Sequence, residues 1–84
     1  MSTLANEHII PLASKVWFNN DMIFVLLTDG REIGVPILWF PKLRKASSAQ
    51  LNNYRLIGKG IGIHWDELDE DISVEGMLTG KNIQ

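Results

Sequence analysis

The sequence predicts a small single α+β domain, in which an antiparallel β-meander and a second hairpin pack with two or three short helices. Apolar runs rich in Val, Ile, Phe and Trp are separated by turn residues at 19–21 and 29–30, which is typical of consecutive antiparallel strands. After Pro36 the apolar spacing lengthens from two to three, which indicates helical turns. With 84 residues and no Cys, the chain has room for one small core and no disulfide to support it.

The domain is expected to cover residues 13–80. Residues 1–12 lack any periodicity and predict a poorly ordered lead-in, and residues 81–84 are expected to form a tail. No apolar run approaches the ~20 residues that a bilayer requires, and no basic region precedes a long apolar stretch. We therefore expect no signal peptide, no membrane helix and a cytoplasmic location.

Three strands are expected first. Ala13–Phe18 and Met22–Thr28 form the predicted first hairpin, because both runs are rich in β-branched and aromatic residues. Arg31–Val35 adds a third antiparallel strand after the Asp-Gly turn. Pro36 has no backbone N–H, so it is expected to end this strand and to suit the first turn of a helix.

Two short helices are expected in the middle of the chain. The first would bury one face formed by Ile37, Phe40 and Leu43, although Pro41 interrupts a regular helix. The second is expected to begin at Ser47 or Ser48, because Gln50 completes the pattern of a capping box. Its buried residues would be Leu51 and Tyr54.

The C-terminal part is expected to contain a hairpin and a last helix. Arg55–Ile57 and Ile61–Trp65 flank a glycine-rich turn, with His64 on the face opposite Ile61, Ile63 and Trp65. The last helix is expected over Ser73–Thr79, capped by Ser73, closed by Gly80 and anchored by Val74, Met77 and Leu78.

The charges are segregated along the chain, although the net charge is only −2. Residues 42–59 hold five bases and no acid, and residues 66–75 hold six acids and no base. One interpretation is that the two stretches are solvated faces that partly neutralise each other in the fold. The other is that the acidic segment steers a basic protein toward an interface.

Residue patterns for catalysis, metal binding and phosphate binding are incomplete. The glycines at 58, 60 and 62 match neither a Walker loop nor a dinucleotide loop, so they favour a tight turn. Residues 64–71 are rich in acids but lack the Gly that a calcium loop of the EF-hand type requires. His64 with Asp66, Asp69 or Asp71 could act as a general acid and base, but no nucleophile accompanies it. We expect no catalytic residues, no metal site and no cofactor.

Two surfaces remain as candidates for binding. Trp39 lies beside the Ile37–Leu43 face and could form an exposed aromatic contact. Basic side chains could contact nucleic acid, but a pI of about 5.5 argues against strong binding to phosphates by this chain alone. The candidate nucleic-acid residues are Lys42, Arg44, Lys45 and Arg55.

Several short motifs follow one another in a recognisable order. They are Asp29-Gly30-Arg31, Val35-Pro36-Ile37, Phe40-Pro41-Lys42-Leu43, Gly62-Ile63-His64-Trp65 and Leu68-Asp69-Glu70-Asp71-Ile72-Ser73-Val74. In this order the chain resembles the bacterial domain-of-unknown-function 2442 family over residues 16–80. Family members commonly have Arg in place of Lys42 and Pro in place of Asp66, so this chain lacks the guanidinium fork and the rigid exit from the last strand that those residues supply.

The resemblance implies a non-enzymatic role. Members of this family resemble antitoxin components encoded beside a small domain-of-unknown-function 4160 protein. It implies that this chain is an antitoxin-like interaction domain that binds a small, basic, toxin-like partner protein. The predicted partner-binding residues are Trp39, His64, Trp65, Asp69, Glu70 and Asp71. The alternative is a regulatory or sensing module that binds nucleic acid or a small ligand as an oligomer, and the sequence leaves self-association open.

Overall fold

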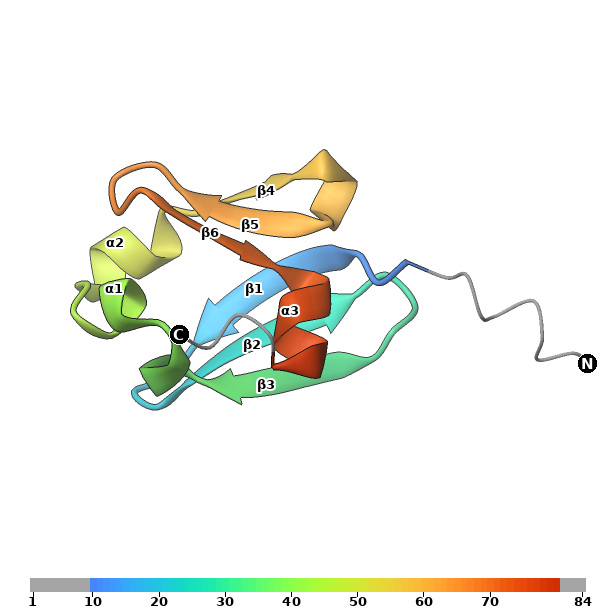
Figure 1. The fold of residues 1–84 in the computed structure, drawn as a ribbon, viewed down its shortest axis with the longest axis horizontal. Coiled ribbons are helices and arrows are strands. Elements are labelled where there is room, and N and C mark those ends of the chain that lie inside the picture. The colour runs from blue at the N-terminus through green and yellow to red at the C-terminus, as the bar shows by residue number, and fades with distance from the viewer. Residues whose placement is uncertain (1–9, 81–84) are drawn as a thin grey trace, which may run out of the picture.

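A computed structural model describes residues 10–80 as two three-stranded antiparallel sheets with short helices (Figure 1). The first sheet has the order β1-β2-β3, and the second has the order β4-β5-β6. The strands are β1 (Ala13–Phe18), β2 (Met22–Leu27), β3 (Glu32–Pro36), β4 (Arg55–Ile57), β5 (Gly62–Trp65) and β6 (Glu70–Ser73). The α+β class predicted from the sequence is confirmed. Most of the predicted lead-in and the predicted tail lie outside the described residues.

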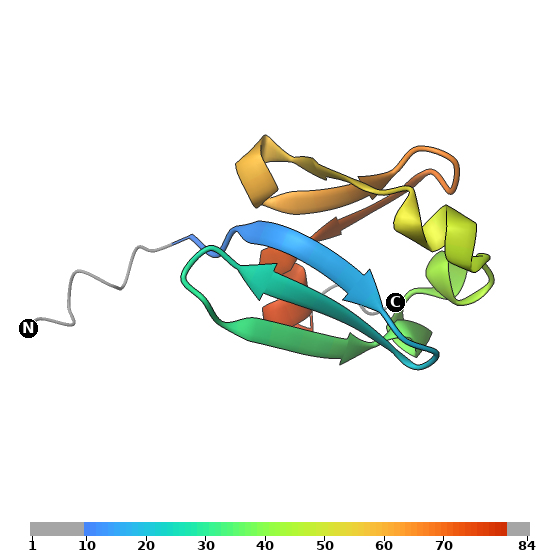
Figure 2. The same cartoon turned by 180° about the vertical axis from the view of Figure 1, so that it is seen from behind.

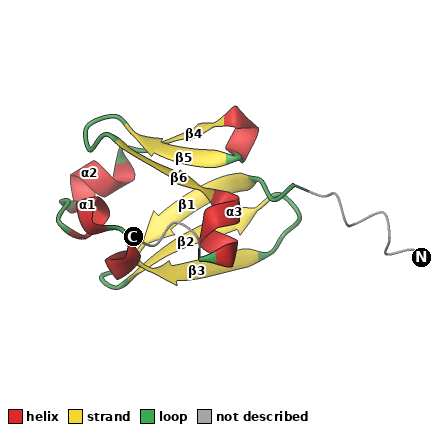
Figure 3. Cartoon of the chain, in the orientation of Figure 1, coloured by secondary structure: helices red, strands yellow, loops and turns green. Residues whose placement is uncertain are grey.

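Short helices connect the strands, as Figure 3 shows in red. A 3-10 turn η2 (Ile37–Trp39) and the helices α1 (Pro41–Arg44) and α2 (Ser48–Asn52) join the two sheets at one end of the molecule. A second 3-10 turn, η3 (Gly58–Gly60), joins β4 to β5, and α3 (Val74–Thr79) follows β6. Within residues 10–80, no helix is long and apolar enough to cross a membrane.

One core lies between the first sheet and the elements on its inner side, which are the second sheet and α3. Side chains alternate along β2, so Ile23, Val25 and Leu27 point into this core. The second sheet contributes Ile63, Trp65 and Ile72, and α3 contributes Val74 and Met77. The buried face predicted for Ile37, Phe40 and Leu43 is confirmed.

The predicted helix ends are also confirmed. The Ser47 hydroxyl accepts a hydrogen bond from the Gln50 backbone N–H, and the Gln50 side chain accepts one from the Ser47 N–H, so the capping box is complete. Ser73 caps α3 by accepting from the Gly76 N–H at 2.9 Å. Gly80 ends the same helix with a left-handed φ of 78°.

Three predictions from the sequence need correction. Residues 70–73 form strand β6, which was not predicted. Ile61 precedes β5 and is 46% exposed, because the turn at η3 carries it out of the strand's alternation. Leu78 does not anchor α3, since only Val74, Gly76 and Met77 of this helix are buried.

Candidate functional site

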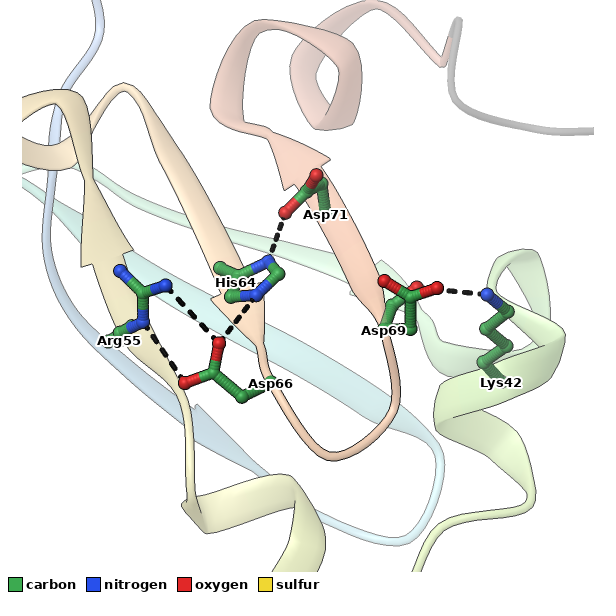
Figure 4. A network of polar contacts seen from close by, with 6 residues as sticks. All are labelled: Lys42, Arg55, His64, Asp66, Asp69 and Asp71. Carbon is green, nitrogen blue, oxygen red and sulfur yellow. Dashed lines mark hydrogen bonds and ion pairs between the residues drawn. The ribbon is translucent and has the colours of Figure 1, made fainter.

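A row of polar side chains crosses the outer face of the second sheet. The strand register places Arg55 of β4 beside His64 of β5, and His64 beside Asp71 of β6. His64 points away from the core because its neighbours Ile63 and Trp65 point into it. Figure 4 shows that Asp66, from the turn after β5, joins this row from below.

These side chains form a continuous network of ion pairs. The Arg55 guanidinium donates through Nε and Nη2 to the two carboxylate oxygens of Asp66, each at 3.2 Å. His64 contacts Asp66 through Nε2 at 2.8 Å and Asp71 through Nδ1. We name this set, Arg55, His64, Asp66 and Asp71, the ion-pair row.

The contacts of the ion-pair row shift the pKa values of His64 and Asp66. The hydrogen bond to Asp71 raises the pKa of His64 above its ordinary value of 6.5, and Asp66 adds to the same effect. The hydrogen bond from Arg55 lowers the pKa of Asp66 below its ordinary value of 3.8. Only an imidazolium can donate from both ring nitrogens at once, so two flanking carboxylates favour the charged form of His64.

This geometry does not favour a catalytic role for His64. Both ring nitrogens contact carboxylates, so neither is directed at a substrate proton. Within residues 10–80, no group of three or more His, Asp or Glu side chains is arranged to hold a metal ion. The ion-pair row is thus a charged feature of the outer face of the second sheet.

A groove lies beside this row, between β6 and the segment formed by η2 and α1. It measures about 360 Å³ and has a mixed apolar and charged lining. The lining residues are Trp39, Phe40, Pro41, Lys42, Glu70, Asp71 and Ile72. Lys42 Nζ donates to the backbone carbonyl of Asp69 at 2.9 Å, which fixes α1 against the turn before β6 (Figure 4). We call this site the β6 groove.

The structure brings most of the predicted partner-binding residues together here. Trp39, Glu70 and Asp71 line the β6 groove, and His64 contacts Asp71 from the neighbouring strand. Asp69 lies at the end of the groove in a turn, where its φ is 52°. Asp71 thus belongs both to the groove and to the ion-pair row.

Trp65 does not belong to this surface. Its side chain is fully buried, and its indole N–H donates to the backbone carbonyl of Leu51 at 3.0 Å. The prediction of Trp65 as a contact residue is therefore corrected: it holds α2 onto the second sheet. The ring points inward because Trp65 shares the face of Ile63, which is also fully buried.

The predicted nucleic-acid residues do not form one patch. Arg55 is engaged with Asp66 on the outer face, whereas Lys42 lies in the β6 groove beyond the intervening turn (Figure 4). Arg44 lines a second hollow of about 280 Å³ beside the turn at Asn19 and Asn20. The basic and acidic stretches thus meet in the fold, as one of the two interpretations of the charge pattern predicted.

Sequence reasoning missed Phe40, Pro41 and Ile72 as groove residues and Asp66 as the partner of Arg55. The charge segregation is the signal that could have paired Arg55 with an acid of the 66–75 segment. No sequence signal identifies the apolar lining, because it depends on β6 lying beside η2 and α1.

Comparisons with known proteins agree with this fold. A protein of unknown function from Rhodospirillum rubrum ATCC 11170, solved by crystallography, has a TM-score of 0.73 and 32% identity over 83% of this chain and 87% of its own. An uncharacterised protein from Chromobacterium violaceum, solved by NMR in solution, has a TM-score of 0.73 and 23% identity over 94% of this chain and 72% of its own. No curated protein matches the chain significantly.

The family comparison covers the whole folded part. Residues 13–82 match the family described as "Protein of unknown function (DUF2442)". This range includes every strand, the ion-pair row and the β6 groove. The chain belongs to the DUF2442 family.

Proposed function

We propose that this chain is a non-enzymatic interaction domain, antitoxin-like in role, that binds an extended basic segment of a small partner protein in the β6 groove. The observation that carries the proposal is the groove itself, which combines an aromatic wall at Trp39 with the carboxylates of Glu70 and Asp71. Protein interfaces favour aromatic anchors at their centre and polar residues at their rim.

The position of β6 supports an extended ligand. β6 is an edge strand, since the second sheet has the order β4-β5-β6, and three of its residues line the groove. Edge strands bind extended peptides by adding one more strand, while adjacent pockets take alternate side chains. An extended segment with basic and apolar side chains would therefore face Glu70 and Trp39.

The charges support a basic partner. Glu70 and Asp71 lie in the groove, and Glu67 and Asp69 lie in the exposed turn that precedes β6. The groove's Lys42 is held by the Asp69 carbonyl, which leaves the Glu70 carboxylate to face a ligand, while the Asp71 carboxylate is shared with His64. Carboxylates on a rim chiefly increase the association rate of a positively charged protein.

A pull-down from the native host with three tagged forms tests this proposal. The forms are the wild type, the groove variant E70Q/D71N and the control D21N/D29N, which removes two charges from turns of the first sheet. Mass spectrometry identifies the recovered protein, which is then purified and titrated against each form by calorimetry.

The groove variant should bind about 2- to 30-fold more weakly than the wild type, because each exposed pair contributes about 0.2–1 kcal/mol. The control should bind like the wild type. Equal affinity of the wild type and E70Q/D71N would show that the partner does not use the β6 groove, and an acidic partner would refute the charge argument.

A further inference from the structure

Strand β2 has apolar residues on both faces, although the fold covers only one of them. All six residues of Met22–Leu27 are apolar, whereas a strand with one solvated face normally alternates apolar and polar residues. Ile23, Val25 and Leu27 fill the core, which leaves Met22, Phe24 and Leu26 half-buried on the other side. Figure 2 looks onto this side, and no helix or strand of residues 10–80 lies over it.

Neighbouring strands extend this apolar surface. The Trp17 ring of β1 stacks on Phe24, with centroids 5.7 Å apart and an interplanar angle of 16°. Phe24 in turn leans over Gly34 of β3, where a Cβ would lie 3.0 Å from its ring. We call this surface, formed by Lys15, Trp17, Met22, Phe24, Leu26, Glu32 and Gly34, the outer sheet face.

The charges of the outer sheet face lie at opposite edges of one row. The strand register aligns Lys15 of β1 with Leu26 of β2, and Leu26 with Glu32 of β3. The row therefore reads positive, apolar, negative from one edge to the other. When a second copy of this row faces the first in the opposite order, each charge lies opposite a charge of the other sign.

We propose that the outer sheet face binds a second copy of this chain, face to face, about a two-fold axis that runs along β2. This rotation exchanges the positions of β1 and β3, so Lys15 of each copy meets Glu32 of the other. Leu26 and Phe24 meet their own equivalents on the axis, and Trp17 lies opposite the small Gly34. An isologous contact of this kind forms a closed dimer, and two packed sheets at about 10 Å allow these side chains to interdigitate.

The area of the outer sheet face sets the expected strength of the dimer. Three strands spaced by about 4.8 Å, each about 20 Å long, give a footprint of roughly 300 Å². Standard interfaces bury about 800 Å² per partner, so this dimer belongs to the weak class. We therefore expect dissociation in the micromolar range, with monomer and dimer both populated across accessible concentrations.

A second copy fits this face better than a strongly charged partner does. Lys15 and Glu32 cancel within the row, so the face offers neither the basic surface that nucleic acid requires nor the acidic surface of the β6 groove. The proposal is also independent of that groove, because the lining residues of the groove are not part of the outer sheet face.

Sedimentation equilibrium from about 5 µM to about 500 µM tests the dimer with paired charge reversals. The wild type should pass from the mass of one chain to that of two. K15E places Glu opposite Glu32, and E32K places Lys opposite Lys15, so each variant alone should dimerise about tenfold more weakly or worse. An equimolar mixture of the two should regain the wild-type association, because each then meets an opposite charge.

Both substitutions lie at exposed positions, so the fold should persist, and circular dichroism checks this. K45E, a reversal at the exposed end of α1, serves as the control and should dimerise like the wild type. A wild type that keeps the mass of one chain at every concentration overturns the proposal. So does a dimer that tolerates both reversals, or a mixture that fails to recover the association.

Discussion

Replacing Trp65 with Phe tests the contribution of this residue to stability separately from binding at the β6 groove. Trp65 is fully buried in the second sheet, and its indole N–H donates to the Leu51 carbonyl of α2. Phe keeps an aromatic ring at this position but has no donor, so the Leu51 carbonyl would lose its hydrogen bond in a buried setting. The variant should therefore lose stability while the β6 groove keeps its residues.

The magnitude follows from two losses. A buried carbonyl without its donor costs about 1–3 kcal/mol, and the smaller ring forfeits about 1–2 kcal/mol of buried area and packing. The sum, about 2–5 kcal/mol, is a large share of the ~4–13 kcal/mol expected for a domain of 84 residues. The melting temperature should fall by at least about 8 °C.

Urea unfolding followed by circular dichroism at 25 °C measures the stability loss, and titration of the purified partner measures binding. Trp39→Ala is the counterpart, since Trp39 is only partly buried and lines the groove. It should weaken binding about tenfold or more with a smaller loss of stability. A Trp65→Phe loss below about 1 kcal/mol would refute the assigned hydrogen bond and packing. Binding weakened equally by both variants, each fully folded, would refute the placement of the site.

Three further outcomes are expected. Because the pKa of His64 is raised in the folded state, its contribution to stability is complete below pH 6.5 and is lost as the pH rises through the folded pKa. The difference in unfolding free energy between wild type and H64Q, measured in urea, should therefore shrink as the pH is raised from about 5 to about 9. A gap that widens with pH contradicts this sign. Gly60→Ala should cost about 3 kcal/mol or more, because φ is +106° and a Cβ would lie 2.3 Å from the Ala13 carbonyl oxygen; an unchanged melting temperature argues against that contact. Ser47→Ala should cost about 1 kcal/mol through the lost cap, and equal urea midpoints would disprove the capping box.

Local signals predicted much of the fold. The first three strands, the capping box at Ser47 and the Ser73 cap follow from short-range chemistry that operates within four residues, so the sequence alone predicts them. Pro41 divides the predicted helix into η2 and α1, as its missing N–H requires.

Strand β6 could not be predicted in the same way. Glu70 and Asp71 have low strand propensity, and the alternation has only Ile72 as a buried member. The strand exists because β5 supplies a partner through four aligned pairs, with Asp71 beside His64 on the outer face. Non-local pairing of this kind overrides propensity and leaves little trace in a single sequence.

The candidate site was predicted only in part, because the β6 groove also depends on contacts between segments that are distant in the sequence. Acidic residues and Trp39 were expected to contact a partner, and the groove does bring Trp39 beside Glu70 and Asp71. Trp39 and Trp65 both belong to apolar segments, and the sequence does not show which of the two rings points into the core. The prediction of Trp65 as a contact residue is wrong because the alternation of β5 and the hydrogen bond to the Leu51 carbonyl of α2 hold its ring in the core.

The central claim is that Glu70 and Asp71 guide a basic partner into the β6 groove. Stopped-flow association rates of the purified partner, measured over a series of NaCl concentrations, test it most directly. The wild-type rate should fall steeply with salt, while E70Q/D71N should associate several-fold more slowly at low salt and respond less to salt. Identical rates and identical salt dependence for the two proteins would contradict the account.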